Sequence, residues 1–327
     1  MLLRHRSLRR TPKAKTAAVL DGLPDRFGHA GSLNWQWMST CAPSRLARIE
    51  AAQNADGGWG YFPGKESWLE PTAYALLALR EEVRARLASE KGWRLVRSWE
   101  AAGGGWRACG RVAEPHWATS LVVTLYSAMG LNDAAFGRGV EWLMASRGAE
   151  TRAIARVAHW LSPRTIEFDA ALSGWPWQTG TSSWVEPTAH ALMALGRVKG
   201  RVEASGIEER IGMGKCMLLD RRCRDGGWNY GNRRVLGADL PSQPETTAVA
   251  LMALDGDASI RWGAALDHME RLGRETASPL ARAWIGACLL QYRGARPMWE
   301  KAEPLDRGDI LVDAVESISW NRIMAAG

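Results

Sequence analysis

The sequence predicts an all-α protein, an α/α toroid of about five or six helical hairpins. Two observations point to this fold: a Gly-Trp motif recurs along the chain, and a strongly apolar helical segment follows it at a fixed distance. The 327 residues contain 18 Trp but only 5 Tyr and 4 Phe. Such an excess of Trp indicates either a repeated structural position or an aromatic-lined cavity.

The repeat is defined by its spacing. Eleven residues after each of the first three motif tryptophans stand Glu70, Trp117 and Glu186, and in the fourth unit Glu245 follows after seventeen residues. The similar segments Glu-Pro-Thr-Ala, Glu-Pro-Thr-Ala and Glu-Thr-Thr-Ala open at the three glutamates. The four motifs are Gly57-Gly58-Trp59, Gly104-Gly105-Trp106, Gly174-Trp175 and Gly226-Gly227-Trp228.

Each unit reads as an outer helix, a Gly-rich turn and an inner helix. Pro71 and Pro187 suit the first helical position, and a carboxylate just before them is expected to cap the free N–H groups of the first turn. The Ala/Leu/Met-rich segments that follow are apolar nearly all round, so both faces must be covered. Amphipathic outer helices are predicted at 44–53, 92–102, 137–147 and 207–223, and a further pair at 259–273 and 279–292.

Apolar inner helices ringed by amphipathic ones favour a closed toroid over an open solenoid, because each inner helix needs cover on two sides. We therefore predict one toroid domain over residues 31–327, preceded by a basic, disordered tail over 1–30. Strand signals are nearly absent.

The charge pattern limits the partners. The formal net charge is +7, but residues 1–15 alone carry six basic side chains and no acidic one, so the rest of the chain is near neutral. No nucleic-acid partner is expected for the folded body. The tail is a candidate for peripheral contact with a membrane. No stretch is apolar enough for a transmembrane helix or a secretory leader, which predicts a cytoplasmic protein.

The five cysteines are widely spread and contain no Cys-x-x-Cys pair, so neither a disulfide framework nor a zinc site is expected. We predict no metal and no cofactor.

The repeats resemble those of squalene-hopene cyclases and of protein prenyltransferase β subunits. The resemblance lies in Asp56-Gly57-Gly58-Trp59-Gly60 with Glu70-Pro71-Thr72-Ala73, and in Asp225-Gly226-Gly227-Trp228 with Glu245-Thr246-Thr247-Ala248. It covers roughly residues 46–292 and implies the toroid fold. In the triterpene cyclases a Gln caps the inner helix and a Trp stacks on it, tying neighbouring repeats together. The resemblance therefore implies a structural role for the glutamates and tryptophans of the repeat.

The chain also departs from these families. The Asp-x-Asp-Asp motif with which class II cyclases start a carbocation cascade is missing, and so is the Asp-x-Cys pair that holds zinc in protein prenyltransferases. Asp255-Gly256-Asp257-Ala258 is the nearest string, but it follows an inner helix and reads as a polar turn.

Candidate catalytic residues are Glu70, Glu186, Glu245 and His190, although capping is an alternative role for the glutamates. When Glu-Pro-Thr-Ala is laid on Asp-Asp-Thr-Ala, the glutamates fall at the family's proton-donating Asp. His190 lies on an apolar first turn and would gain a shuttle role if it paired with a glutamate. Candidate ligand-binding residues are Trp117, His116, Tyr74 and Asp239. A lumenal Trp117 would stabilise a cation, and the alternative is a Trp117 that fills a gap in the core.

Three functions remain open from the sequence. The first is a terpenoid cyclase-like or prenyltransferase-like toroid that binds an isoprenoid or another apolar ligand in its lumen, with acid-initiated cyclisation. The second is a non-catalytic binding or scaffold protein that kept the fold; a lumen filled by side chains would favour it. The third is a carbohydrate-active toroid, which needs two carboxylates in a polar cleft, whereas a lumen of Ala, Leu and Met does not suit a sugar.

Overall fold

The structure of the chain is a computed structural model that describes residues 45–82, 85–151, 167–202, 205–297 and 308–325. The chain divides into a segment Met1–Cys41 and a compact unit Ala42–Gly327, and all the described residues belong to the second. The predicted basic tail over residues 1–30 lies outside them.

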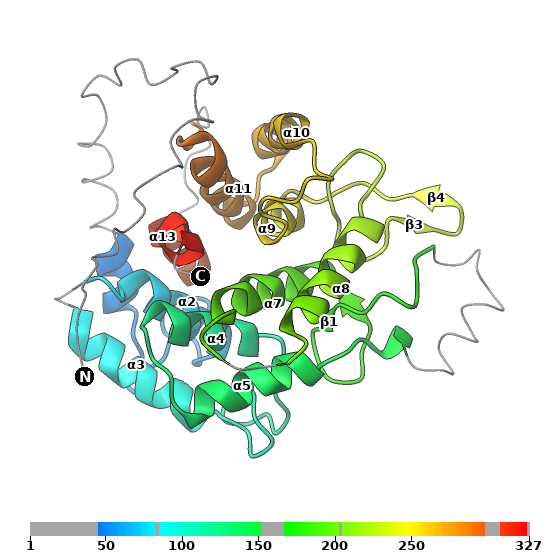
Figure 1. The fold of residues 1–327 in the computed structure, drawn as a ribbon. Coiled ribbons are helices and arrows are strands. Elements are labelled where there is room, and N and C mark those ends of the chain that lie inside the picture. Colours follow the sequence, from blue (N-terminus) through cyan, green and yellow to red (C-terminus); the bar gives the residue numbers. More distant parts are fainter. Residues whose placement is uncertain (1–44, 83–84, 152–166, 203–204, 298–307, 326–327) are drawn as a thin grey trace, which may run out of the picture. The chain divides into compact units, whose positions relative to one another are not determined.

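The apolar inner helices of the compact unit form a closed ring, which confirms the predicted α/α toroid (Figure 1). Each helix packs against the next, and the last packs against the first. In ring order they are α2 (Leu69–Leu79), α4 (Thr119–Ala128), α7 (Val185–Val198), α9 (Pro244–Ala253), α11 (Pro279–Arg293) and α12 (Ile310–Ser317).

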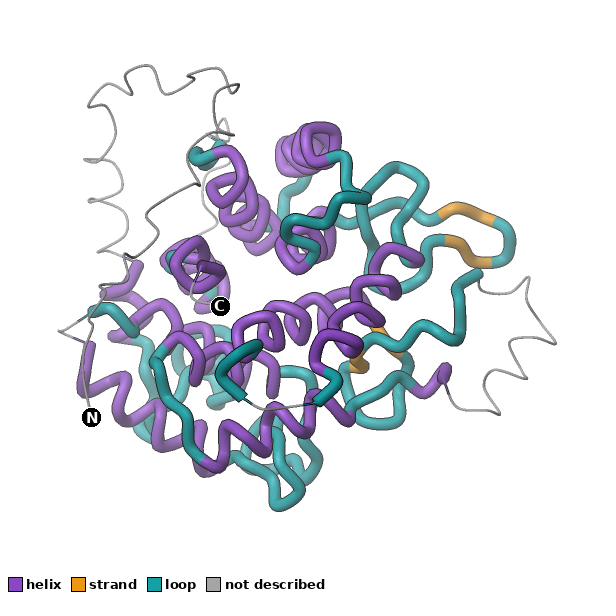
Figure 2. The backbone as a smooth tube through the Cα atoms, viewed as in Figure 1, coloured by secondary structure: helices purple, strands orange, loops and turns teal. Residues whose placement is uncertain are grey.

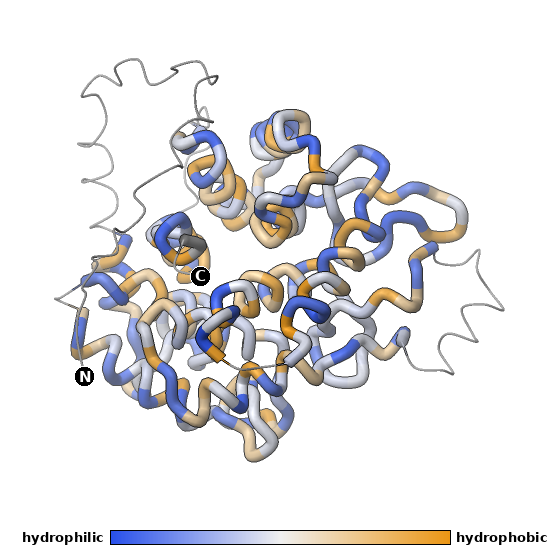
Figure 3. Tube along the Cα trace, in the orientation of Figure 1, coloured by the Kyte–Doolittle hydropathy of each residue, from blue (hydrophilic) through white to orange (hydrophobic). Residues whose placement is uncertain are grey.

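The outer helices pack against this ring. Residues 45–51 form the first, followed by α3 (Arg86–Ser98), α5 (Ala134–Ala145), α8 (Ile207–Asp220) and α10 (Trp262–Glu275). Hydrophilic and hydrophobic stretches alternate along α3 and α5 (Figure 3), as expected for helices with one face on the core. A short 3₁₀ turn, η2 (Ala149–Thr151), follows α5, and the final helix α13 (Trp320–Ala325) contacts α11.

The four motif tryptophans are buried in the joints between units. In three of them the indole N–H donates to a carbonyl in the outer helix of the same unit, as Trp59 does to Ile49 at 2.6 Å. The backbone N–H of every motif tryptophan donates to a threonine hydroxyl in the first turns of the following inner helix, as Trp59 does to Thr72 at 3.0 Å. These bonds fix the inner helix to the turn that precedes it.

Each of the first three motif tryptophans also packs against the outer helix of the next unit. A glycine of that helix makes room for the indole: a Cβ built on Gly139 would lie 2.5 Å from Cζ3 of Trp106, and Gly92 and Gly214 face Trp59 and Trp175 in the same way. The motif tryptophans therefore tie neighbouring units together, as the family resemblance implies.

The predicted capping by glutamates is wrong. The N-cap positions of α2, α7 and α9 fall on Trp68, Trp184 and Gln243, and none of these helices has a side-chain cap. At α2 and α7 the second residue after the turn tryptophan of the next unit instead offers its backbone carbonyl, as Tyr230 does to the N–H of Val185 at 2.9 Å. Pro71 and Pro187 consequently lie at the third helical position rather than the first.

The same carbonyl bond recurs around the ring and closes it. Ala108 accepts from Leu69, Trp177 from Trp117, and Tyr61 of the first unit from Ile310 of α12 at 3.0 Å. Arg48 adds a charged link between the ends of the ring, because its Nε donates to Asp313 of α12 at 2.9 Å.

The strands of the described chain are two short antiparallel ribbons, drawn in orange in Figure 2. β1 (Trp175–Pro176) pairs with β2 (Ser183–Trp184), and β3 (Arg234–Val235) pairs with β4 (Ala238–Asp239). The second ribbon is formed by the residues that lengthen the fourth unit.

No helix of the described residues is both long and apolar enough to cross a membrane.

Candidate functional site

Four carboxylates stand at one end of the ring, where the inner helices begin. Glu70, Glu186 and Glu245 occupy the first turns of α2, α7 and α9, and Asp309 is the N-cap of α12. All four are half-buried. We refer to these four residues as the carboxylate rim. The sequence analysis did not identify Asp309.

Glu70 is the best-defined member of the carboxylate rim. Its Oε2 accepts a hydrogen bond from the Tyr61 hydroxyl at 2.7 Å. Burial raises the pKa of Glu70 to about 7; the Tyr61 bond opposes that rise, and the charges of Glu245 and Asp309 add to it. Near neutral pH, a substantial fraction of Glu70 therefore carries a proton.

The side-chain carboxylates of Glu186 and Glu245 have no hydrogen bond or ion pair within the described residues. Burial raises the pKa of Glu186 well above its ordinary value, and Glu245 and Glu70 raise it further. Burial and Asp309 raise the pKa of Glu245. The charge on one of these carboxyls therefore disfavours the charge on its neighbours.

Aromatic side chains cross the ring one helical turn below the rim. Tyr74 and His190 lie four residues after Glu70 and Glu186, and the Tyr74 hydroxyl is 3.2 Å from Nε2 of His190. Trp284 of α11 contacts both, at 6.0 Å from Tyr74 and 5.6 Å from His190 between ring centroids. These three residues come from helices that are not neighbours in the ring, so their contacts fill the lumen at this depth.

Trp117 belongs to the same group. Its ring is 5.3 Å from that of His190 and 5.0 Å from that of Trp177, and its side chain is only 6% exposed. We refer to Tyr74, Trp117, His190 and Trp284 as the central aromatic cluster. Tyr74 stands one turn after Glu70 on α2, and burial together with the charges of Glu70, Glu186 and Glu245 raises the pKa of its hydroxyl.

His190 is neutral in this setting. Burial, and next the charge of Arg197, lower its pKa to about 3. The hydrogen-bond partner of its Nε2 is Tyr74 rather than a glutamate, so the glutamate pairing that would support a proton shuttle is not seen among the described residues.

His116 touches the cluster at its edge, with its ring centroid 6.3 Å from that of Trp117, whereas Asp239 lies apart from it. His116 Nδ1 accepts from the backbone N–H of Ala118 at 3.2 Å, and burial lowers the pKa of the imidazole to about 4. Asp239 is exposed on β4, where it pairs with Arg224 at 3.1 Å and Arg234 at 3.7 Å.

The structure adds Tyr61, Asp309 and Trp284 to the residues predicted from the sequence. Tyr61 had a detectable signal, because aromatic residues stand two positions after the motif tryptophan in three units, at Tyr61, Trp177 and Tyr230. Asp309 and Trp284 belong to units without a Gly-Trp motif and had no such signal.

No group of three or more His, Cys, Asp or Glu within the described residues is arranged to hold a metal ion.

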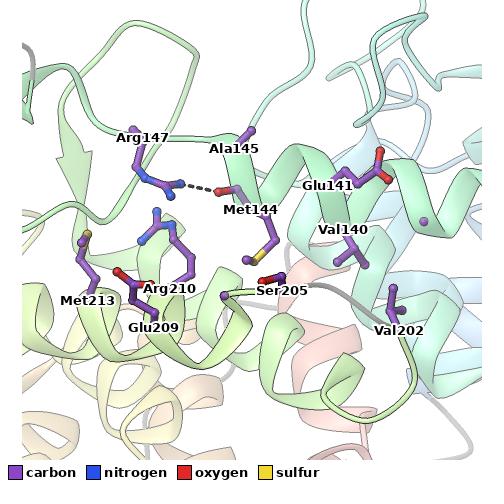
Figure 4. Close-up of a pocket in the computed structure, with 12 residues that line it drawn as sticks. Val140, Glu141, Met144, Ala145, Arg147, Val202, Ser205, Glu209, Arg210 and Met213 are labelled. Atoms are coloured by element: carbon purple, nitrogen blue, oxygen red, sulfur yellow. Dashed lines mark hydrogen bonds between the residues drawn. The ribbon is translucent and has the colours of Figure 1, made fainter.

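A separate groove of about 570 Å³ lies between the outer helices α5 and α8 (Figure 4). Arg147 donates to the carbonyl of Met144 there, and Arg210 places its guanidinium 3.3 Å from the Trp175 ring. The groove contains none of the residues predicted to form the site.

No family model and no curated protein sequence matches the chain. Among solved structures, the apo form of type II terpene cyclase MstE from Scytonema is similar at 16% identity and a TM-score of 0.50, covering 88% of this chain and 79% of that one. A variant of MstE in complex with its substrate, geranylgeranyl dihydroxybenzoate, gives the same identity and TM-score and covers 88% and 78%.

Cellobiose 2-epimerase from Spirochaeta thermophila DSM 6192 is similar at 12% identity and a TM-score of 0.52, covering 90% of this chain and 87% of that one. These enzymes carry out different chemistry on the same architecture. At such identities the similarity shows an α/α toroid, and the function has to be argued from the site itself.

Proposed function

We propose that the ring binds an isoprenoid or another apolar ligand at its carboxylate rim, and that a rim carboxyl starts cyclisation by protonating it. The observation that carries this proposal is Glu70, a carboxyl that burial keeps partly protonated near neutral pH, directly above aromatic rings. The fold shared with a type II terpene cyclase supports it.

The geometry suits an acid. Protonation of an alkene requires a group that still holds its proton at working pH and can give it to carbon. With Tyr61 donating to Oε2, the proton of Glu70 resides on Oε1. Its transfer would form a C–H bond, leave a carbocation on the adjacent carbon and leave Glu70 as a carboxylate. The faces of Trp117 and Trp284 would stabilise the cation until a neighbouring carbon gives a proton to water or back to the Glu70 carboxylate, which forms the final C=C bond.

Product profiles test the proposal. The protein is incubated with squalene, farnesyl diphosphate and geranylgeranyl diphosphate, and extracts are analysed by gas chromatography and mass spectrometry. Glu70→Gln should lower any cyclised product by about 10²-fold or more, the scale of general acid catalysis. Glu141→Gln, an exposed site on α5, is the control. Loss of product in Glu186→Gln but not in Glu70→Gln would move the role of acid to Glu186.

A non-catalytic ligand-binding or scaffold protein is the second candidate. It is favoured by the contacts among Tyr74, His190 and Trp284, which fill the lumen below the rim and leave less depth for a long substrate. Saturable binding of geranylgeraniol without any product would support this candidate. Absence of both product and binding would contradict an isoprenoid ligand altogether.

A further inference from the structure

A cavity of about 270 Å³ lies where the third and fourth units meet, next to the carboxylate rim. Trp184 and Gln243 line it, and each stands two residues before a rim glutamate, Glu186 and Glu245 respectively. Two residues of extended chain span at most about 7 Å, so the cavity adjoins the rim. Its remaining lining residues are Asn229, Tyr230, Gly231, Asn232, Leu240 and Pro241.

The turn that forms one wall of this cavity is held in place by buried side chains. Asn229 accepts from the N–H of Gly231 at 3.0 Å and donates to the carbonyl of Asn232 at 2.7 Å. The guanidinium of Arg221 donates to the carbonyl of Gly231 at 2.7 Å. The Trp184 ring packs on this turn, since a Cβ built on Gly231 would lie 3.2 Å from it. The cavity is therefore preformed.

The lining selects against a charged head group. It contains two aromatic rings, aliphatic side chains and amides, but no charged side chain. Three arginines lie near in the sequence, but none lines the cavity: the buried Arg221 donates through Nη1 to Gly231, Arg224 pairs with Asp239 at 3.1 Å, and Arg233 donates to the carbonyl of Asp220 at 2.8 Å. A diphosphate needs free cationic donors, and its charge would be repelled by any ionised carboxylate of the rim.

A flat, uncharged ring suits these walls better. The indole of Trp184 and the phenol of Tyr230, which is 54% exposed, offer aromatic surfaces for stacking. The amides of Asn232 and Gln243 offer both donors and acceptors to a hydroxyl group. This combination of an apolar surface with a few polar groups is typical of small-molecule sites.

We propose that this cavity, which we name the head-group pocket, binds the uncharged hydroxylated aromatic head of a prenylated ligand whose chain extends over the carboxylate rim. This inference rests on the proposed function, because it presumes that the ring binds a prenyl chain. It adds the chemical class of the head group and the residues that select it.

Calorimetric titration of the whole protein with three ligands tests the inference. Geranylgeranyl hydroquinone, geranylgeraniol and geranylgeranyl diphosphate share one chain and differ in the head group. The hydroquinone should bind at least about tenfold more tightly than the other two, which corresponds to about 1.4 kcal/mol. Trp184→Ala should remove this preference while leaving the affinity for geranylgeraniol unchanged.

Two further variants guard against misfolding and non-specific effects. Tyr230→Ala removes an exposed side chain and so should preserve the fold while weakening hydroquinone binding several-fold. Trp68→Ala is the matched control, since Trp68 precedes Glu70 as Trp184 precedes Glu186 but does not line the pocket. It should leave the preference intact.

The outcomes separate the two proposals. Equal binding of the three ligands, or tightest binding of the diphosphate, would overturn the head-group pocket while the proposed ligand class stands. An unchanged preference in both Trp184→Ala and Tyr230→Ala would overturn it as well. If none of the three ligands binds, the proposed function fails, and the pocket assignment fails with it.

Discussion

The motif tryptophans and the central aromatic cluster use similar side chains in different ways. Trp59, Trp175 and Trp228 are at most 2% exposed, and each indole N–H donates to a carbonyl of an outer helix. The rings of the central cluster instead contact one another across the lumen. The motif tryptophans tie neighbouring helices together, whereas the rings of the central cluster contact one another and fill the lumen.

The second unit contains one tryptophan of each group, Trp106 in the joint and Trp117 in the central cluster. The indole nitrogen of Trp106 is buried without a hydrogen-bond partner among the described residues, although its backbone N–H still donates to Thr119 at 2.9 Å. In the same unit Trp117 takes the position that glutamate holds elsewhere and joins the central cluster. This unit therefore keeps the joint but replaces the acid with an aromatic ring.

The largest expected difference between the two groups is in stability. Trp59→Ala should lower the free energy of unfolding by about 3–5 kcal/mol, because it empties a fully buried joint. Trp117→Phe, which keeps an aromatic ring in the central cluster, should cost less than about 1.5 kcal/mol. Urea unfolding followed by circular dichroism measures both. Equal losses would mean that the central cluster is as much a part of the joints as the motif tryptophans are.

The glycines that face the motif tryptophans provide a second test. Gly139→Ala would place a methyl group 2.5 Å from the Trp106 ring and should destabilise the protein by about 1–3 kcal/mol through overpacking. Gly137→Ala on the same helix is the control: its Cβ meets nothing within 4 Å, so it should be neutral or stabilising by up to about 1 kcal/mol. The melting temperature should therefore fall for Gly139→Ala and should rise or stay unchanged for Gly137→Ala.

Replacing a threonine that accepts a hydrogen bond from a motif tryptophan should lower the free energy of unfolding by a somewhat smaller amount. Thr188→Val keeps the shape but removes the oxygen that accepts from the N–H of Trp175 at 2.9 Å, which should cost about 1–2 kcal/mol. Thr188→Ser keeps the hydroxyl and should recover most of this loss in urea unfolding. If serine were no better than valine, the methyl group rather than the hydrogen bond would hold the joint.

Much of the fold could be predicted because the joints repeat locally. The spacing from Trp59 to Glu70 and from Trp175 to Glu186 fixes where inner helices begin, and their composition requires cover on both sides. The last part of the ring was not predicted, since α12 has no Gly-Trp motif before it. The capping prediction was wrong because the carbonyl that satisfies the N–H of Val185 comes from Tyr230, in the following unit.

The site was only partly predictable, because its contacts join units that are distant in the sequence. Glu70, Glu186 and His190 occupy positions that the repeat defines, so they could be nominated from the sequence alone. Their environment could not, because the Tyr61 bond to Glu70 and the Tyr74 bond to His190 depend on how the ring closes. Whether these carboxyls serve as acids stays a prediction.

A further expected effect is the pH dependence of stability contributed by Glu70. Its pKa is about 7 in the folded protein and 4.5 as its ordinary value, so between these values the folded state holds a proton that the unfolded state has released. Stability from this group therefore falls as pH rises from about 4.5 to about 7 and is level above that range. Glu70→Gln should flatten this slope in unfolding curves recorded across the range, whereas Glu141→Gln should not. An unchanged slope in Glu70→Gln would show that Glu70 titrates normally.

The bond between Ile310 and the carbonyl of Tyr61 has a consequence for the newly made chain. Tyr61 is synthesised well before Ile310, so the position of Tyr61, and with it the donor to Glu70, is secured only after α12 has left the ribosome. Until then the apolar faces of α2 and α11 that α12 covers remain open to solvent. A chain that lacks α12 would thus expose apolar surface that favours aggregation, and Glu70 would lack its fixed hydrogen-bond donor until α12 packs.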